Sequence, residues 1–168
     1  MKQVKIQLGT LFVSGNMPHD WQIYAAFQLL EKQTILNIPT GYGKSHVLAT
    51  AAYILANRGE HVTLLYHTEL IKNRDQDTFA HLLKLDKDGV PLVSFEAIWG
   101  TDREGKPCLN YKPEIFTGRV LMDEIDVTFL DQYEFRDNIM PYKDTISGVT
   151  ASATANDKTS MFEKEYLE

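Results

Sequence analysis

The sequence predicts an α/β fold of three layers, in which helices cover both faces of a mainly parallel sheet. Apolar, β-branched segments alternate along the chain with segments whose apolar residues recur at helical spacing. Several predicted strands lack polar alternation, as strands covered on both faces do. Each strand–helix–strand unit needs a crossover connection, which makes its two strands parallel. The loops that follow the strands are therefore expected at one edge of the sheet, where ligands bind.

The length and composition predict a single globular domain over residues 1–168. A chain of 168 residues is close to the size of one typical domain. Hydrophobic residues make up 43% and charged residues 24% of the sequence, which is typical of proteins with a buried core. The formal net charge of -6 excludes a broadly basic surface for nucleic acid. The single cysteine, Cys108, excludes an intrachain disulfide and a metal site built from several cysteines.

The sequence predicts a cytoplasmic protein without an integral membrane segment. No stretch reaches the ~20 consecutive apolar residues of a membrane-spanning helix. Residues 1–13 carry two lysines and two glutamines among their apolar positions, unlike the apolar region of a signal peptide. The low cysteine content favours a reducing compartment.

A helix and a short strand are predicted first. The helix starts near Pro18, a favoured residue in a first turn, and runs over residues 20–32. Its expected apolar face consists of Trp21, Ala25 and Leu29. Residues 34–38 form an apolar run that stops at a proline and a glycine, which predicts a buried strand entering a tight loop.

The next elements are two helices on either side of a strand. Residues 44–58 predict a helix that ends at Gly59 in a left-handed conformation. Residues 62–66 predict a buried strand, and Thr68 then caps a helix over residues 69–85. The expected apolar positions of the two helices are Val47, Ala51, Ile54 and Leu55, and then Leu70, Phe79, Leu82 and Leu83.

Three further strands complete the predicted sheet. They cover residues 90–95, 119–122 and 145–149. Residues 101–113 resemble a linker, and a short helical excursion is expected over residues 131–142.

The segment from Pro39 to Ser45 is predicted to bind the phosphates of a nucleotide. It lies between a predicted strand and a predicted helix, as a P-loop does. Glycines let the backbone turn its N–H groups toward phosphate oxygens, and the helix N-terminus adds a positive dipole end. Lys44 would reach the β and γ phosphates, and Ser45 would bind a magnesium ion. The residues predicted to bind the nucleotide here are Thr40, Gly41, Tyr42, Gly43, Lys44 and Ser45.

Two features of this segment leave alternatives open. The P-loop pattern has a glycine where this chain has Ile38, so a glycine-rich turn without a ligand is the competing interpretation. Tyr42 is large for its position, and its ring either lies over the nucleotide or faces solvent.

A second predicted site lies at the end of a buried strand, in the sequence Asp-Glu-Ile-Asp. Asp123 would hold the magnesium ion, and Glu124 would act catalytically by orienting and deprotonating the attacking water. Lys44 would stabilise the charge on the phosphates. The competing interpretation is a solvated acidic turn. The P-loop earlier in the sequence favours the metal site over this alternative.

These two segments resemble motifs of superfamily 2 helicases and translocases, whose motor lobes have a RecA-like fold. Residues 39–45 are similar to the first motif, and residues 123–126 are similar to the D-E-x-D box. The third motif of these proteins couples the nucleotide site to lobe movement. It can be aligned with this sequence in two ways, either at Ser152, Ala153 and Thr154 or at residues 148–153. The resemblance makes Asp126 the partner of this motif. A run of small residues after a strand is also commonly only packing.

Within the superfamily, the sequence resembles most closely the first motor lobe of the SecA preprotein translocation ATPases, which act in protein transport. Asp20-Trp21-Gln22 is similar to their D-V-Q signature, which implies that Gln22 reads the adenine base. An exposed helical glutamine is the alternative. Asn73-Arg74-Asp75 is similar to their segment after the second strand.

The resemblance implies an ATP-binding motor lobe that requires Mg²⁺. The second lobe and its arginine finger have no counterpart in residues 1–168, so we expect ATP binding with weak or no hydrolysis by this chain alone. A second lobe, in cis or in trans, would make it an ATPase that moves polypeptide or nucleic acid; the -6 charge slightly favours polypeptide.

Two other functions are compatible with the motifs. A nucleotide-switched binding module without catalysis would keep the same phosphate loop. A small P-loop kinase would need a lid with clustered arginines, and the five arginines of this chain are scattered along the sequence.

Overall fold

The computed structural model describes residues 18–38, 43–79, 86–110, 112–127 and 133–150. In these ranges a six-stranded sheet has the order β1-β6-β5-β2-β3-β4. The strands are β1 (Ile35–Leu36), β2 (Val62–Thr68), β3 (Val93–Thr101), β4 (Pro107–Leu109), β5 (Arg119–Met122) and β6 (Ile146–Val149). Every pairing is parallel except the one between β3 and the edge strand β4. The predicted α/β fold with a mainly parallel sheet is confirmed.

The strand order brings segments that are distant in the sequence to one edge of the sheet. β6 lies between β1 and β5. Gly148 of β6 lies opposite Ile35 of β1 on one side and opposite Met122 of β5 on the other. β5 in turn pairs with β2. Because these strands are parallel, the residues that follow β1, β2, β5 and β6 all leave the sheet at its carboxyl edge.

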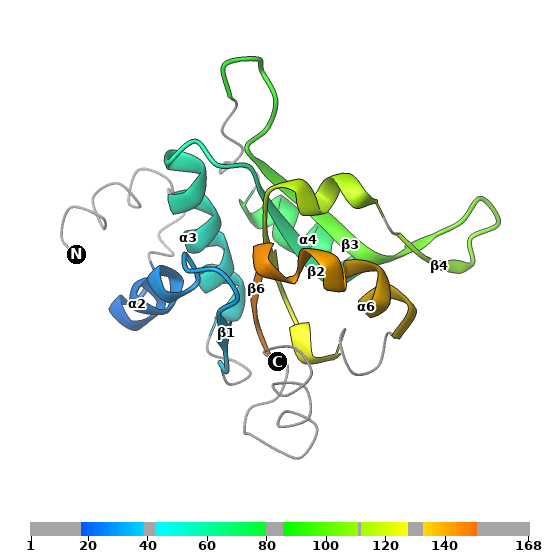
Figure 1. The fold of residues 1–168 in the computed structure, drawn as a ribbon, viewed down its shortest axis with the longest axis horizontal. Helices are drawn as coiled ribbons and strands as arrows, with labels where there is room; N and C mark the ends of the chain where they lie inside the picture. The colour runs from blue at the N-terminus through cyan, green and yellow to red at the C-terminus, as the bar shows by residue number, and fades with distance from the viewer. Residues whose placement is uncertain (1–17, 39–42, 80–85, 111, 128–132, 151–168) are drawn as a thin grey trace.

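Three helices follow the predicted order, and they are shown with the sheet in Figure 1. They are α2 (Asp20–Gln28), α3 (Lys44–Asn57) and α4 (Glu69–Phe79). As predicted, Gly59 lies just beyond α3 in a left-handed conformation, with φ of 83°. Thr68 also meets its prediction, because its hydroxyl accepts a hydrogen bond of 3.5 Å from the N–H of Ile71 in the first turn of α4. Residues 80–85, including Leu82 and Leu83, lie outside the described residues.

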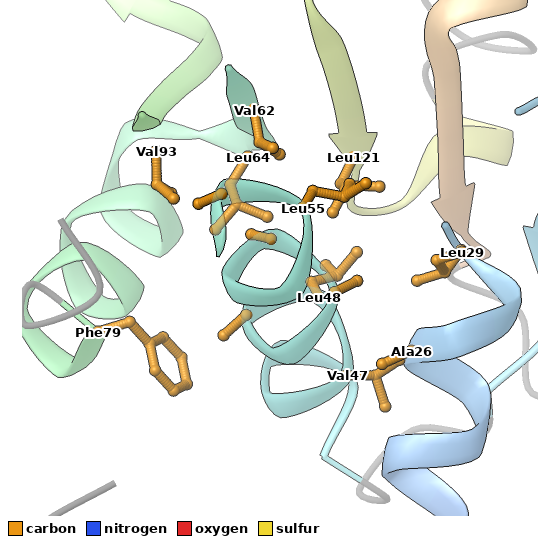
Figure 2. Close-up of a cluster of buried hydrophobic side chains, with 14 of the residues drawn as sticks. Ala26, Leu29, Val47, Leu48, Leu55, Val62, Leu64, Phe79, Val93 and Leu121 are labelled. Carbon is orange, nitrogen blue, oxygen red and sulfur yellow. The ribbon is translucent and has the colours of Figure 1, made fainter. Parts of the chain in front are cut away.

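The two faces of the sheet carry separate clusters of buried side chains. On one face, α2, α3 and Phe79 of α4 pack against β2, β3 and β5, and Figure 2 shows this cluster around Leu48 and Leu64. On the other face, Leu65 and Met122 pack against Phe116 of the 3-10 helix η2 (Pro113–Thr117) and against Ile139 of α6 (Tyr133–Ile139). Strand residues therefore alternate between the two clusters, as the pleat requires.

The first helix differs from its prediction in both its end and its buried face. It ends at Gln28 instead of residue 32, and its buried residues are Gln22, Ile23 and Ala26. Trp21 is 40% exposed. The reason is tertiary: α2 packs on α3, and that contact selects which side of the helix is covered.

The fourth helix also buries a face that its apolar residues did not indicate. Leu70 is 81% exposed, so the prediction that it faces the core is wrong. Asp75 and Phe79, four residues apart, are the buried residues of α4. A charged residue thus occupies a position on the covered side of the helix.

The predicted third strand is present as β3, but it begins and ends later in the chain than predicted, and the segment after it is a hairpin. Asp86 accepts hydrogen bonds from the N–H groups of Asp88 and Val90, which forms a turn, so the strand begins only at Val93. The expected linker contains the β3–β4 hairpin, whose turn is held by hydrogen bonds to the side chain of Asp102. The helical excursion is confirmed as α6 followed by the 3-10 helix η3 (Met140–Thr145).

None of the helices in the described ranges is long and apolar enough to span a membrane.

Candidate functional site

The described part of the predicted phosphate loop begins at Gly43, the residue that caps α3. Gly43 has φ of 79°, and its carbonyl accepts the first hydrogen bonds of the helix. Lys44 and Ser45 are the first two residues of α3 and are half-buried. The N-terminus of this 14-residue helix therefore points its N–H groups toward the carboxyl edge of the sheet. Thr40, Gly41 and Tyr42 lie outside the described residues.

Gln22 packs directly against the phosphate loop. Its side chain is buried, with its Nε2 donating a 3.5 Å hydrogen bond to the carbonyl of Gly43. Its Oε1 accepts a 2.8 Å hydrogen bond from the N–H of His19 at the start of α2. A Cβ on Gly43 would lie 2.5 Å from Gln22 Nε2, so the amide of Gln22 would have to shift, and φ of 79° also favours glycine at this position. The alternative of an exposed helical glutamine is wrong, and base recognition by Gln22 stays a prediction.

Asp123 is a buried carboxylate at the end of β5. It is 8% exposed, and its N–H donates a 2.9 Å hydrogen bond to the carbonyl of Leu65 in β2. Burial raises the pKa of Asp123 to about 6, against the opposing effect of the positive charge on Lys44. Within the described residues no Lys, Arg or His lies within ion-pair distance of this carboxylate. The charges of Lys44 and Asp123 thus act on each other across the edge of the sheet.

Glu124 has an uncommon backbone conformation. Its φ is 49°, a left-handed value, and its N–H donates a 3.0 Å hydrogen bond to Asp123 Oδ1. Left-handed backbone at a residue other than glycine costs free energy and is commonly found at functional sites. Asp126 follows on the next turn and is buried. Glu124 is half-buried, whereas Asp123 and Asp126 are buried.

The segment that leads into the predicted coupling motif is tied to the strand before the phosphate loop. The hydroxyl of Thr150 donates a 3.0 Å hydrogen bond to Asn37 Oδ1, and the N–H of Thr150 donates to the carbonyl of Leu36. Ser152, Ala153 and Thr154 lie outside the described residues, so their contact with Asp126 stays a prediction.

A comparison with protein families matches residues 17–113 to the family of the type III restriction enzyme, res subunit. The match covers more than half of the chain. This chain belongs to that family. Its α/β fold with a mainly parallel sheet is the fold of helicase domains of known structure. A comparison with curated proteins found no match.

Solved structures of helicases and a related ATPase share the fold of this res-subunit domain. The UvsW helicase from bacteriophage T4 superposes with a TM-score of 0.62 and 18% identity, over 89% of this chain and 57% of that one. A hypothetical ATP-dependent RNA helicase from Sulfolobus tokodaii superposes with a TM-score of 0.58 and 14% identity, over 99% of this chain and 55% of that one. The Sulfolobus solfataricus SWI2/SNF2 ATPase core, solved with dsDNA, superposes with a TM-score of 0.53 and 12% identity. The match covers 84% of this chain and 33% of that one. The res-subunit domain thus spans about a third to just over half of these chains.

The structure adds three residues to the site region that motif reasoning did not assign to it. Arg74 Nη2 donates a 3.5 Å hydrogen bond to Ser45 Oγ, and Arg74 Nε donates a 3.0 Å hydrogen bond to Asp75 Oδ1. Tyr66, at the carboxyl end of β2, is buried near the charges of Asp75 and Asp123. The sequence contained two signals for Asp75 and Arg74. Asp75 lies four positions before Phe79 on the same side of α4, and Asn73-Arg74-Asp75 is similar to a segment of the SecA ATPases.

The residues at this edge fit a magnesium ion. Asp123 is a buried carboxylate whose ionised form lacks an ion-pair partner among the described residues. A divalent cation beside it would offset the burial that raises its pKa. Ser45 contributes a hydroxyl, and hydroxyl and carboxylate oxygens are ligands that Mg²⁺ prefers. Phosphate oxygens and water would complete its shell.

A separate cleft of about 390 Å³ lies at the opposite edge of the sheet. Its lining includes His61, Gly118 and Thr145, which precede β2, β5 and β6. It contains none of the site residues predicted from the sequence.

Proposed function

We propose that this chain is an ATP-binding motor lobe that binds ATP with Mg²⁺ and that residues 1–168 form one such domain. The observation that carries the proposal is the electrostatic interaction between Lys44, at the N-terminus of α3, and the buried Asp123 at the end of β5. Lys44 and Asp123 lie at adjoining positions of the carboxyl edge of the sheet. A cation there suits the negatively charged triphosphate, and a carboxylate suits the metal ion bound to it. Membership of the res-subunit family supports the same function.

Each site residue has a specific part in this function. Lys44 and the N–H groups at the start of α3 bind phosphate oxygens. Ser45 and Asp123 hold the magnesium ion, which neutralises charge on the phosphates when it is bound. Glu124 orients the attacking water and accepts its proton. Gln22 contacts Gly43 through its side-chain amide and also contacts the base.

We expect the lobe to hydrolyse ATP slowly when it acts alone. Phosphoryl transfer is accelerated roughly 10³- to 10⁵-fold by an arginine finger, which in two-lobed motors comes from the second lobe. A second RecA-like lobe, in cis or in trans, would supply it. Paired in this way, the domain would couple ATP hydrolysis to movement along a polymer.

Nucleic acid is the polymer that the family favours. The family is that of a restriction enzyme subunit, and the similar folds include a phage helicase and an ATPase core solved with dsDNA. The resemblance to SecA implies polypeptide instead. Addition of dsDNA, RNA or an unfolded polypeptide to the chain distinguishes the two, because the true track should raise the slow hydrolysis rate.

The function is tested by titrating a fluorescent ATP analogue with and without Mg²⁺. Lys44→Ala should abolish binding, because it removes the charge opposite the phosphates. Glu124→Gln should retain binding but eliminate the residual hydrolysis. Lys106→Ala, at an exposed lysine in the β3–β4 hairpin, is the matched control and should bind normally. Normal ATP binding by Lys44→Ala would refute the proposed function.

A further inference from the structure

Arg74 of α4 lies beside the proposed magnesium ligand without belonging to any motif that we assigned to the nucleotide. Its guanidinium makes two contacts, one with Asp75 Oδ1 at 3.0 Å and one with Ser45 Oγ at 3.5 Å. The side chain is 65% exposed, so its charged end is close to the site and still accessible to solvent. A cation at this position is available to a ligand that binds at the start of α3.

The orientation of Arg74 is imposed by its neighbour. Adjacent residues in a helix point about 100° apart and do not normally contact each other. The guanidinium of Arg74 therefore folds back to reach Asp75, and this bend directs Nη2 toward Ser45 on α3. The edge-to-face contact between the rings of His46 and Phe79, with centroids 5.3 Å apart, holds α4 against α3.

Asp75 is a strong anchor because it is a buried charge. It is 2% exposed, and within the described residues Arg74 is the cation within ion-pair distance of it. Its Oδ2 and the hydroxyl of Tyr66 are both buried, and burial together with the neighbouring carboxylate of Asp75 raises the pKa of Tyr66. A buried carboxylate that loses its cation is strongly destabilised, so Asp75 retains Arg74.

Magnesium binding would change the partner of Arg74. A guanidinium and a divalent cation cannot both approach the hydroxyl oxygen of Ser45 closely, because their charges repel. The exposed guanidinium has five N–H donors and matches the geometry of phosphate oxygens. The nearest new anion would be the triphosphate on the same magnesium ion.

We propose that Arg74 is a phosphate-binding residue of this site, contributed by α4 and held in position by Asp75. Arg74 contacts Ser45 in the structure, and in the ATP complex it turns to a phosphate oxygen while Nε stays on Asp75. This inference rests on the proposed ATP-binding function. It gives this lobe a second cationic side chain for binding phosphate, in addition to Lys44.

The test measures the dissociation constants of MgATP and of magnesium tripolyphosphate for the 168-residue chain. Arg74→Ala should weaken both by the same factor, roughly 10- to 100-fold, because the lost contact is a charged hydrogen bond to phosphate. Arg74→Lys should recover part of the loss. Arg103→Ala, at an exposed arginine in the β3–β4 turn, is the control and should bind both ligands normally.

Asp75 is tested as a positioning residue by a double-mutant comparison. Asp75→Asn should weaken MgATP binding when Arg74 is present and should have little further effect in the Arg74→Ala background. Thermal denaturation of each variant establishes that it is folded. Arg74→Ala leaves Asp75 without its cation, so Arg74→Lys, which keeps a cation beside Asp75 and should still bind MgATP more weakly than the unmodified chain, carries the test if either other variant does not fold.

Two outcomes would overturn the inference, and they are distinguishable. MgATP binding by Arg74→Ala within twofold of the unmodified chain, with Lys44→Ala inactive in binding, would refute the role of Arg74 alone. Normal binding by Lys44→Ala would refute the proposed function and the role of Arg74 with it.

Discussion

At the scale of single residues, burial disfavours the charged form of Asp123, which is the form that would bind a metal ion. Its carboxylate lies at the end of a buried strand, where water cannot solvate its charge fully, and burial raises its pKa to about 6. Lys44 offsets only part of this effect. The charged form is thus costly in the free chain and would be favourable beside a cation.

The raised pKa of Asp123 predicts how stability depends on pH. The folded chain binds a proton at this site more tightly than the unfolded chain, so the free energy of unfolding should fall as pH rises from about 4 to about 6. A shift of about two pKa units corresponds to about 3 kcal/mol. Asp123→Asn should remove this fall. Urea denaturation at a series of pH values measures it, and an identical pH dependence in both proteins would contradict the prediction.

Replacement of Gly43 is predicted to affect ATP binding for a reason that Gly59 does not share. Both have a left-handed backbone, with φ of 79° and 83°, so alanine should cost each about 1 to 2 kcal/mol in folding free energy. At Gly43 the new Cβ would also meet Gln22 Nε2, whereas no atom lies within 4 Å at Gly59. Gly43→Ala should therefore weaken ATP binding, and Gly59→Ala should not.

Titration of the two glycine variants with a fluorescent ATP analogue measures this difference. Equal ATP affinities for the two single variants would show that the space beside Gly43 is unimportant.

At the scale of the elements, the position of α2 depends on a residue at the start of β5. The guanidinium of Arg119 donates hydrogen bonds of 2.7, 3.0 and 3.3 Å to the carbonyls of Leu30, Leu29 and Glu31, just after the helix ends. Arg119 is buried, and burial lowers its pKa. A cation at this end also complements the negative end of the helix dipole. Because Gln22 belongs to α2, this distant contact supports the phosphate loop.

Arg119→Ala is predicted to destabilise the fold by about 3 to 5 kcal/mol. The substitution removes three charged hydrogen bonds and leaves carbonyl groups without partners. Chemical denaturation measures the loss. The exposed Arg103→Ala should change the free energy of unfolding by less than about 0.5 kcal/mol. A loss below 1 kcal/mol for Arg119→Ala would mean that α2 is held mainly by its apolar contacts with α3.

At the scale of the whole molecule, the parallel sheet unites segments far apart in the sequence. The chain leaves β1, β2, β5 and β6 at one edge, so Gly43, Tyr66, Asp123 and Thr150 all lie there. Ligand binding at this edge should stabilise the complete domain, because each of these segments continues into the core.

MgATP is predicted to raise the melting temperature of the chain. At a concentration 100 times the dissociation constant, a ligand adds about 2.7 kcal/mol of stability. For a domain of this size that corresponds to roughly 5 to 10 °C. Lys44→Ala should show no increase. Differential scanning calorimetry measures the shift, and an equal increase in Lys44→Ala would place the bound nucleotide elsewhere.

The sequence by itself determined the alternation of strands and helices, the start of α3 at Lys44 and the bounds of β5. These are local properties: apolar periodicity, capping residues and turn residues act within a few positions of the chain. The position of Lys44 and Ser45 at the start of α3 could be predicted for the same reason.

Only the tertiary structure decided which side of each helix is covered. Gln22 is buried in place of Trp21, and Asp75 in place of Leu70, because the packing of α2 on α3 and of α4 on the sheet selects the covered face. The contacts of Arg74 with Ser45 and of Arg119 with α2 join residues 29 to 90 positions apart. Such pairings depend on strand order, which local sequence patterns do not specify.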